Sequence, residues 1–364
     1  MKLLTVVFLA SLLLGQLGGI SPWPGVVIYI HDIFLAILVV LYVRKVKQAK
    51  RVVPIALFTG ACLMSLLANY WRFTLPELLT GSLYLVRWVL YTGLYVVVAG
   101  NFVSPRFWLK GLYAVGVGFG VLGFMQFFLY PNLRNLAYLG WDPHYYRLFS
   151  TLLDPNFMGI ILVFTVLLGF RLFRKNSRWI IAGQTVTVLA LFLTYSRSSF
   201  LALGAAVVVW AVIEKRWKLF IVLAVFVGLV LILPHGNTLS LLRADSTLAR
   251  VGNWSEGATL VMKAPVFGYG FDTLRYARTS ANEISKSAAG LDSSILFILA
   301  TTGLVGCAAY ANLVIAMIRA GRHATFYIAS VAALLVHSLF VNSLFYPWVM
   351  IWMWIVAGAV TYDT

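Results

Sequence analysis

Long apolar segments alternate with short polar connections along almost the whole chain. Each apolar segment has about 16 to 24 residues, which is enough for an α-helix to cross the hydrocarbon core of a bilayer. The pattern therefore predicts an all-α, polytopic membrane protein of about twelve transmembrane helices. The segments fall at residues 3–20, 26–43, 52–70, 82–100, 109–130, 152–170, 179–195, 199–213, 219–234, 293–317, 325–341 and 346–361.

The first segment, MKLLTVVFLASLLLGQLGG, could also be a signal peptide. Only Lys2 precedes it as a positive charge, and a clear small-x-small cleavage site is missing. We therefore interpret it as an uncleaved first helix.

Composition and charge agree with a membrane protein. The 364 residues are 62% hydrophobic and 11% charged, with a mean hydropathy of +0.91, far outside the range of a water-soluble domain. A net charge of +17 would suggest nucleic acid as the partner of a soluble chain. Here Lys and Arg concentrate in alternate connections, as cytoplasmic loops do. We therefore expect a cytoplasmic N-terminus and membrane lipids, not nucleic acid, as partners.

One connection is much longer than the others and falls on the outer side in this frame. It divides the chain into helices one to nine (1–234), an extracytoplasmic cap (235–292) and helices ten to twelve (293–364). Long polar segments inside compact bundles are usually functional or disordered. Because apolar stretches such as LVMKAPVFGYGF interrupt the polar sequence of the cap, we expect the cap to fold with short helices. A second outer segment, 130–150, mixes aromatic and basic residues, and we expect it along the membrane interface.

Arginine is costly in a membrane span, and LTYSRSSFLALG (193–204) places Arg197 at the outer end of the seventh segment. Arg197 is either an anchor in the lipid headgroups or part of a binding site, and the neighbouring hydroxyl groups favour the binding site. Arg147 and Arg250 lie on the same outer side. Because guanidinium groups match phosphate oxygens well, the three together predict an acidic, phosphorylated ligand. The alternative is that Asp142, Asp154, Asp245 and Glu256 simply pair with them.

Two further acids stand at the outer ends of helices. Asp154, in DPN, is expected to cap a helix that begins with Pro155. Asp292 follows the cap directly, and it either caps the tenth helix or acts as a general base toward an attacking hydroxyl. His144 and His235 are alternative bases, although neither has a supporting spacing.

Asp32 and Arg87 lie inside apolar segments, where each needs a partner or a cavity. A structural pairing of the two is favoured over a proton relay. Cys62 and Cys307 have no metal-like spacing and are expected in the core. The chain contains no Walker loop, Rossmann fingerprint or metal-ligand spacing, so no metal and no cofactor are expected.

Four motifs, in order, resemble the O-antigen ligase and O-antigen polymerase family of membrane glycosyltransferases. RLFSTLLDPNFMGIIL (147–162) is similar to the Asn-Pro-Asn or Asp-Pro-Asn helix opening of the family, and LTYSRSSFLAL (193–203) to its Thr-x-Ser-Arg signature. RVGNWSEGATLVMKAPVFGYGF (250–271) resembles the cap element with Pro-x-x-Gly-x-Gly, and SSILFILATTGLVG (293–306) the following helix.

The resemblance implies a GT-C-like fold in the bacterial cytoplasmic (inner) membrane, with the active site facing the periplasm or exterior. It implies a glycan donor on polyprenyl pyrophosphate, whose diphosphate Arg197 and Arg250 would hold, with Arg147 and Ser196 assisting. Asp292 stands where ligases have the histidine that activates the acceptor. Implied partners are the lipid-linked oligosaccharide, a lipid-linked or lipid A-core acceptor, and a chain-length regulator.

The favoured function is a surface-polysaccharide polymerase that works by metal-independent, inverting transfer, with Asp292, Arg197 and Arg250 as catalytic residues. A ligase that moves the finished glycan to lipid A-core or another acceptor is the nearest alternative. A lipid-linked glycan flippase or secondary transporter is a different class, supported by the many segments and by intramembrane charges such as Asp32 and Arg87.

Overall fold

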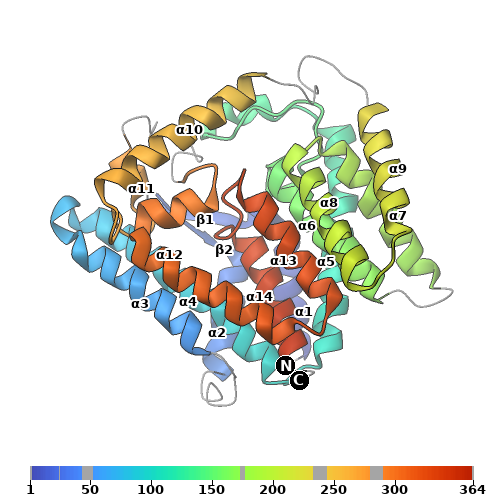
Figure 1. Cartoon of the computed structure of the whole chain (residues 1–364), viewed down its shortest axis with the longest axis horizontal. Helices are drawn as coiled ribbons and strands as arrows, with labels where there is room; N and C mark the ends of the chain where they lie inside the picture. Colours follow the sequence, from blue (N-terminus) through green and yellow to red (C-terminus); the bar gives the residue numbers. More distant parts are fainter. Residues whose placement is uncertain are drawn as a thin grey trace.

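A computed structural model describes residues 2–23, 25–42, 52–172, 177–232, 244–278 and 290–362. Its helices pack around a common core, with one small two-stranded sheet (Figure 1). The α-helices are α1 (Lys2–Ser11), α2 (Ile30–Tyr42), α3 (Val52–Ala68), α4 (Leu75–Ala99), α5 (Pro105–Leu129), α6 (Pro155–Leu172), α7 (Arg178–Leu193), α8 (Arg197–Ile213), α9 (Leu219–Ile232), α10 (Ala244–Lys263), α11 (Leu274–Ala277), α12 (Ser294–Gly321), α13 (Thr325–Ser338) and α14 (Pro347–Tyr362). Short 3-10 helices are η1 (Leu12–Gly18), η3 (Tyr70–Arg72), η4 (Leu133–Leu139) and η5 (Ser150–Leu152).

Each of the twelve apolar segments contains a helix. Within the described residues, four helices are long and apolar enough to cross a bilayer, namely α4, α5, α6 and α12. The other apolar helices are shorter, with 10–17 residues. Helix α6 lies deepest, with 72% of its most apolar window buried, while the outward faces of its neighbours remain hydrophobic. Large exposed apolar side chains of this kind are expected where lipid replaces water.

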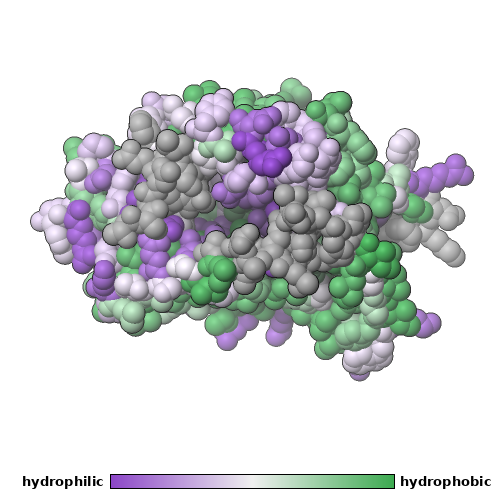
Figure 2. Space-filling model, turned by 90° about the horizontal axis from the view of Figure 1, so that it is seen from above, coloured by the Kyte–Doolittle hydropathy of each residue, from purple (hydrophilic) through white to green (hydrophobic). Residues whose placement is uncertain are grey.

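Helices distant in sequence pack side by side: α8 against α13, α14 against α4, and α12 against α3. The first segment joins the last through Trp348, whose indole donates to the Leu12 carbonyl at 3.0 Å. Seen from above, hydrophilic residues gather around a hollow in the middle of the face, and hydrophobic residues occupy the flanks (Figure 2). The bundle is therefore apolar around its sides and polar at this end.

The periodicity predicts that the second apolar segment is helical from its start, and this prediction is wrong. Residues 19–23 and 26–29 form an antiparallel hairpin of strands β1 (Gly19–Trp23) and β2 (Val26–Tyr29), and α2 begins only at Ile30. Gly25 takes a left-handed φ of 87° at the turn, which only glycine adopts at little cost. Because short apolar runs fit strands as well as helices, hydrophobicity alone could not reveal the hairpin.

Of the short helices expected in the cap, the described residues contain α11, with four residues, but α10 is longer, with 20 residues. It runs along the upper edge of the bundle (Figure 1). The following Pro265–Gly270 stretch lies against a break in α12, where Gly303 has a φ of 64°. Backbone hydrogen bonds join Tyr269 N–H to the Ala300 carbonyl and Gly270 N–H to the Thr301 carbonyl, both at 2.9 Å. The Pro-x-x-Gly-x-Gly motif therefore fastens the cap to α12.

Candidate active site

A cavity of about 490 Å³ lies beneath the cap, within the range of ligand-binding pockets. Its wall is built from the hairpin, α4, the 140–157 segment, the cap and the loop before α14. Two sets of charged side chains line it. The first, called here the Arg250 pole, contains Arg250, Asp142, Asp154 and Asp292; the second, the Asp272 pole, contains Asp272, Arg275, Arg87 and Tyr84.

The carboxyl groups of the two poles respond to different arginines. Asp292 feels Arg250, Arg278 and Asp154, whereas Asp272 feels Arg275 and Arg87. Between them stand Gln16, Tyr29 and Tyr346, joined by hydrogen bonds of 2.7 Å and 3.2 Å through the Gln16 amide. The cavity thus has two electrostatically separate ends and a hydrogen-bonded middle.

Arg250 projects from α10 and reaches the cavity wall. It makes no ion pair or hydrogen bond with the residues that the structure describes, and its charge repels that of Arg197. The two guanidinium groups therefore lie within electrostatic range of each other, although Arg197 is not among the residues of the cavity wall. Such a pair is stable when an anion lies between them.

Arg197 occupies the first position of α8, directly after a buried hydroxyl cluster. Ser196 is the N-cap, and its Oγ accepts from Ser199 N–H and donates to the Asn156 side-chain oxygen at 3.0 Å. Ser198 and Ser199 contact Nε2 of His337 at 3.1 and 3.3 Å. Serine is a strong N-cap because its oxygen satisfies free helix N–H groups. The polar residues that raised the question about Arg197 thus fix the start of its helix.

Arg147 is 4% exposed and is absent from the cavity wall. Its Nε donates to the Thr194 carbonyl at 2.9 Å, and an Nη to the Tyr195 carbonyl at 3.3 Å. These carbonyls end α7 and lead into the turn before Arg197. Cations are favourable at helix C-termini, so the geometry gives Arg147 a role in holding the turn.

The two acids predicted at helix ends differ in their use. Asp154 caps α6 as expected, because Oδ1 accepts from the N–H groups of Asn156 and Phe157 at 2.6 and 3.2 Å. Asp292 does not cap α12, since Ser293 holds that position. Its own N–H instead donates to the Asn253 side chain at 2.8 Å. Burial raises the pKa of Asp292, and Arg250 and Arg278 partly oppose the shift.

One of the four acids that could neutralise the three arginines has another partner. Glu256 pairs instead with Arg278, at 2.8 Å. The side chain of Asp245 and the whole of His235, the alternative base, lie outside the described residues. The pairing of Asp32 with Arg87 is confirmed at 3.0 Å, and the Tyr91 hydroxyl also donates to Asp32 at 2.5 Å. This fits a structural role for the intramembrane charges.

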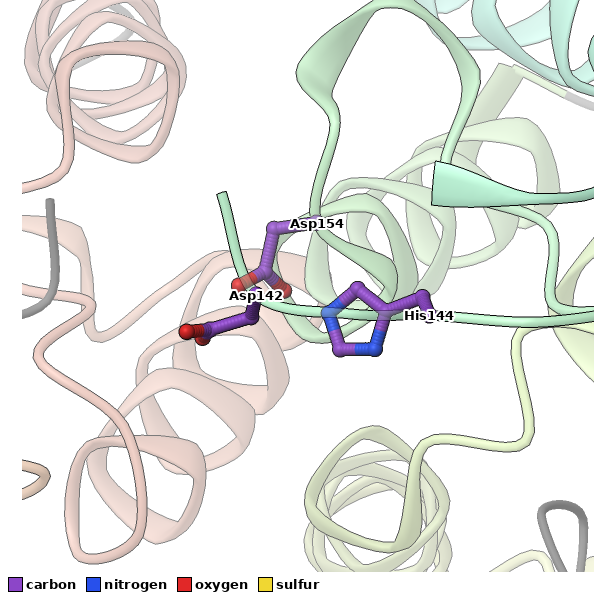
Figure 3. A group of neighbouring side chains, drawn as sticks. All are labelled: Asp142, His144 and Asp154. Atoms are coloured by element: carbon purple, nitrogen blue, oxygen red, sulfur yellow. The ribbon is translucent and has the colours of Figure 1, made fainter. Parts of the chain in front are cut away.

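Asp142, His144 and Asp154 form a group whose possible metal-ligand atoms all lie within 4.8 Å (Figure 3). Arg147 contacts Nδ1 of His144 at 3.4 Å. Since arginine only donates, Nδ1 accepts there, and a neutral ring then carries its proton on Nε2. An Nε2–H group faces carboxylates favourably but does not ligate a metal. Burial and the charges of Asp154 and Asp292 raise the pKa of Asp142 to about 6.

Sequence reasoning missed Asp142 and Asp272 as cavity residues. Asp142 was considered only as an ion-pair partner, although the Asp-x-His spacing in GWDPH offered a signal. Asp272 lies two residues after the second glycine of the Gly-x-Gly motif, and burial raises its pKa to about 7. The two cysteines behave as expected: Cys62 is buried, Cys307 is half-buried, and both are free thiols.

Fold and cavity together define a class: a polytopic helical membrane protein with a charged cavity at one end. Within it, residues 182–311 match the family model described as O-Antigen ligase. The match covers 130 of the 364 residues and confirms the resemblance seen in the sequence. The matched range includes Ser196, Arg197, Arg250 and Asp292 and begins after Arg147.

A curated relative agrees with the family match. Over 181 residues the chain is 26% identical to the O-antigen ligase of Salmonella typhimurium strain LT2. The aligned region covers 44% of this chain and 45% of that protein. The chain thus matches less than half of the relative's length.

Proposed function

We propose that this protein is a membrane glycosyltransferase that uses a glycan on polyprenyl pyrophosphate as its donor, at the outer face of the bacterial cytoplasmic membrane. One observation carries the proposal: Arg250 of the cap lines the same cavity as Asp292, and its charge acts on that of Arg197 at the start of α8. Guanidinium groups are suited to diphosphate, and a carboxylate is suited to take a proton.

The reaction follows from these groups. An acceptor hydroxyl oxygen attacks the anomeric carbon of the donor sugar, and its proton passes to the Asp292 carboxylate. The bond from the anomeric carbon to the pyrophosphate oxygen breaks, and polyprenyl pyrophosphate leaves on the opposite face with inversion. Arg197 and Arg250 stabilise the charge that builds on the departing oxygen, an effect often worth about 3 kcal/mol per donor. The pyrophosphate linkage supplies the driving force, so nucleotide is not required.

Arg147 and Ser196 support the diphosphate site indirectly, by fixing the segment that carries Arg197. Ser196 fixes the first turn of α8, and Arg147 binds the carbonyls just before it. Both therefore set the direction in which Arg197 projects. The diphosphate-binding role predicted for them becomes, in our proposal, a positioning role.

The polyprenyl chain has an apolar route out of the cavity. A second pocket of about 80 Å³ lies between α12, α13 and α14, with mainly aliphatic and aromatic walls. Trp88 and Met350 line both this pocket and the cavity. A donor whose diphosphate lies at the Arg250 pole could thus extend its polyprenyl chain through this pocket to the lipid around the twelve-span bundle.

Polymerisation of lipid-linked repeat units is our first choice among the activities of the family, because Asp292 stands where the ligases have histidine. Ligation to lipid A-core or another acceptor is the second candidate. It is favoured by the names of both matches, which are ligase names. Transport is less well supported, since the buried Asp32–Arg87 pair is bound within the fold.

The decisive experiment incubates purified protein with lipid-linked oligosaccharide, without nucleotide and with or without a metal chelator. Glycans are then separated on a gel. A ladder indicates polymerisation, and a single shift of an added lipid A-core acceptor indicates ligation. Unchanged substrate under all conditions would refute glycosyl transfer.

A further inference from the structure

The proposed reaction involves the residues of the Arg250 pole and none of the residues of the Asp272 pole. Asp272 lies two residues after Gly270, whose N–H donates to the Thr301 carbonyl near the break in α12. Its own φ is 58°, in the left-handed region. Non-glycine residues in this region are uncommon and gather at functional sites. The cap thus holds the Asp272 carboxyl at the cavity wall by a strained turn on a rigid support.

The ionisable groups of this pole are available to a ligand. Arg87 is already bound to Asp32 and to the Val27 carbonyl. Asp272 and Arg275, in contrast, form no hydrogen bond or ion pair with the residues that the structure describes, although their charges attract. Buried charged groups are usually hydrogen-bonded or paired. A ligand with several hydroxyl groups would supply the missing hydrogen bonds.

Aromatic side chains surround this pair. Trp23 of the hairpin is 44% exposed, and Tyr84 and Phe271 complete the wall. The Tyr84 hydroxyl donates to the Gly25 carbonyl at 3.0 Å and fixes the hairpin against α4. An aromatic face packs on the C–H face of a sugar ring, while a carboxylate and a guanidinium bind its hydroxyls.

We propose that the Asp272 pole is the subsite for the acceptor glycan, in which Asp272 and Arg275 bind hydroxyls of one uncharged sugar ring against Trp23 and Tyr84. The proposal rests on the proposed function and assigns the second half of the same cavity. The middle of the cavity, with Gln16 and Tyr346, then lies between acceptor and diphosphate. One hydroxyl of the acceptor would point from this subsite toward the Arg250 pole.

The test measures sugar binding without the diphosphate. The probe is the free oligosaccharide released by mild acid from the polyprenyl-pyrophosphate pool of cells in which this gene is deleted. Its binding to purified protein is followed by saturation-transfer NMR and titration calorimetry. The variants are Asp272→Asn, Arg275→Gln and Arg250→Lys. Asparagine tolerates the left-handed backbone, so Asp272→Asn removes charge without disturbing the turn.

We expect the wild-type protein and Arg250→Lys to bind the free glycan alike, and Asp272→Asn and Arg275→Gln to bind it at least about tenfold more weakly, the loss of one charge-assisted hydrogen bond. Thermal unfolding in detergent checks that each variant is folded. Absence of saturable binding to the wild type would overturn the subsite, as would equal binding by Asp272→Asn. Failure of the proposed function would appear separately, as glycan binding without transfer from the lipid-linked donor.

Discussion

At the scale of single residues, the outer arginines divide into two roles. Arg250 lines the cavity, and its charge acts on that of Arg197 at the start of α8, while Arg147 is buried on the carbonyls that end α7. All three looked alike in sequence, because each lies on the outer side near hydroxyl or aromatic residues. Their side-chain partners, supplied by distant segments, make the difference.

Replacing Arg197 or Arg250 with lysine should lower kcat for glycosyl transfer by about a hundredfold each, because an ammonium group cannot bind two diphosphate oxygens side by side. Initial rates with lipid-linked donor measure the effect. Arg216→Lys is the matched control, since Arg216 is a surface residue paired with Glu214. Unchanged rates in both site variants would show that the diphosphate binds elsewhere.

Protonation of Asp292 should lower the rate of glycosyl transfer at acidic pH, which gives the pH–rate profile an acidic limb. The residue must be ionised to take a proton, and burial raises its pKa above the ordinary carboxyl value of 3.8. Transfer should therefore be fully active above this raised pKa and fall about tenfold per pH unit below it. Rates of wild-type protein from pH 4.5 to 8 measure the limb. If the residual activity of Asp292→Asn kept the same limb, another group would be the base.

At the scale of elements, the contact between the cap and α12 depends on glycine. A Cβ on Gly268 would lie 2.3 Å from the Thr301 carbonyl carbon, and its φ is 65°. A Cβ on Gly303 would lie 2.2 Å from the Val266 carbonyl oxygen. The two backbones can approach only because both positions lack side chains. The family motif in this region therefore has a structural explanation.

Gly268→Ala should separate the cap from α12 and lower the free energy of unfolding by about 2 kcal/mol, through clash and backbone strain. Transfer activity should fall with it, because Arg250 and Asp272 lie on either side of this contact. Thermal unfolding in detergent and initial rates report both effects. Gly252→Ala is the control: it lies on an exposed face of α10 with open space around it, and alanine there should be neutral or slightly stabilising. Equal stability of the two variants would contradict the docking.

At the scale of the whole molecule, the polar hollow and the basic connections should lie on opposite sides of the membrane. Residues of the cap line the cavity, and Figure 2 shows a polar hollow on the face seen from above. Connections such as 214–218 carry the positive charge that marks cytoplasmic loops. In the proposed function, this arrangement would give a lipid-linked sugar access from outside.

Cysteine labelling tests the orientation. In a chain with Cys62→Ser and Cys307→Ser, we expect Tyr138→Cys to react with a membrane-impermeant maleimide in intact spheroplasts. Trp217→Cys should react only after permeabilisation. Both native side chains are well exposed, at 73% and 61%, so access to the two sites is comparable. The reverse labelling pattern would invert the orientation and place the cavity in the cytoplasm.

Local chemistry was sufficient for several features of this protein. Hydrophobic segments located the helices, because burial in lipid needs long apolar runs. The Asp-Pro pair located the cap of α6 by the same short-range logic. Arg197 and Asp292 could be chosen as site residues because charges at the ends of apolar segments are costly unless used.

What only the tertiary structure decided is which distant groups meet. The hairpin at 19–29, the burial of Arg147 on α7 and the positions of Asp142 and Asp272 in the cavity wall all depend on contacts between remote segments. No local spacing encodes such contacts, because they arise from how helices pack. Sequence by itself determined a membrane bundle with outer arginines and carboxyls. Packing determined that Arg250 and the carboxyl groups of Asp142, Asp154, Asp272 and Asp292 share one cavity.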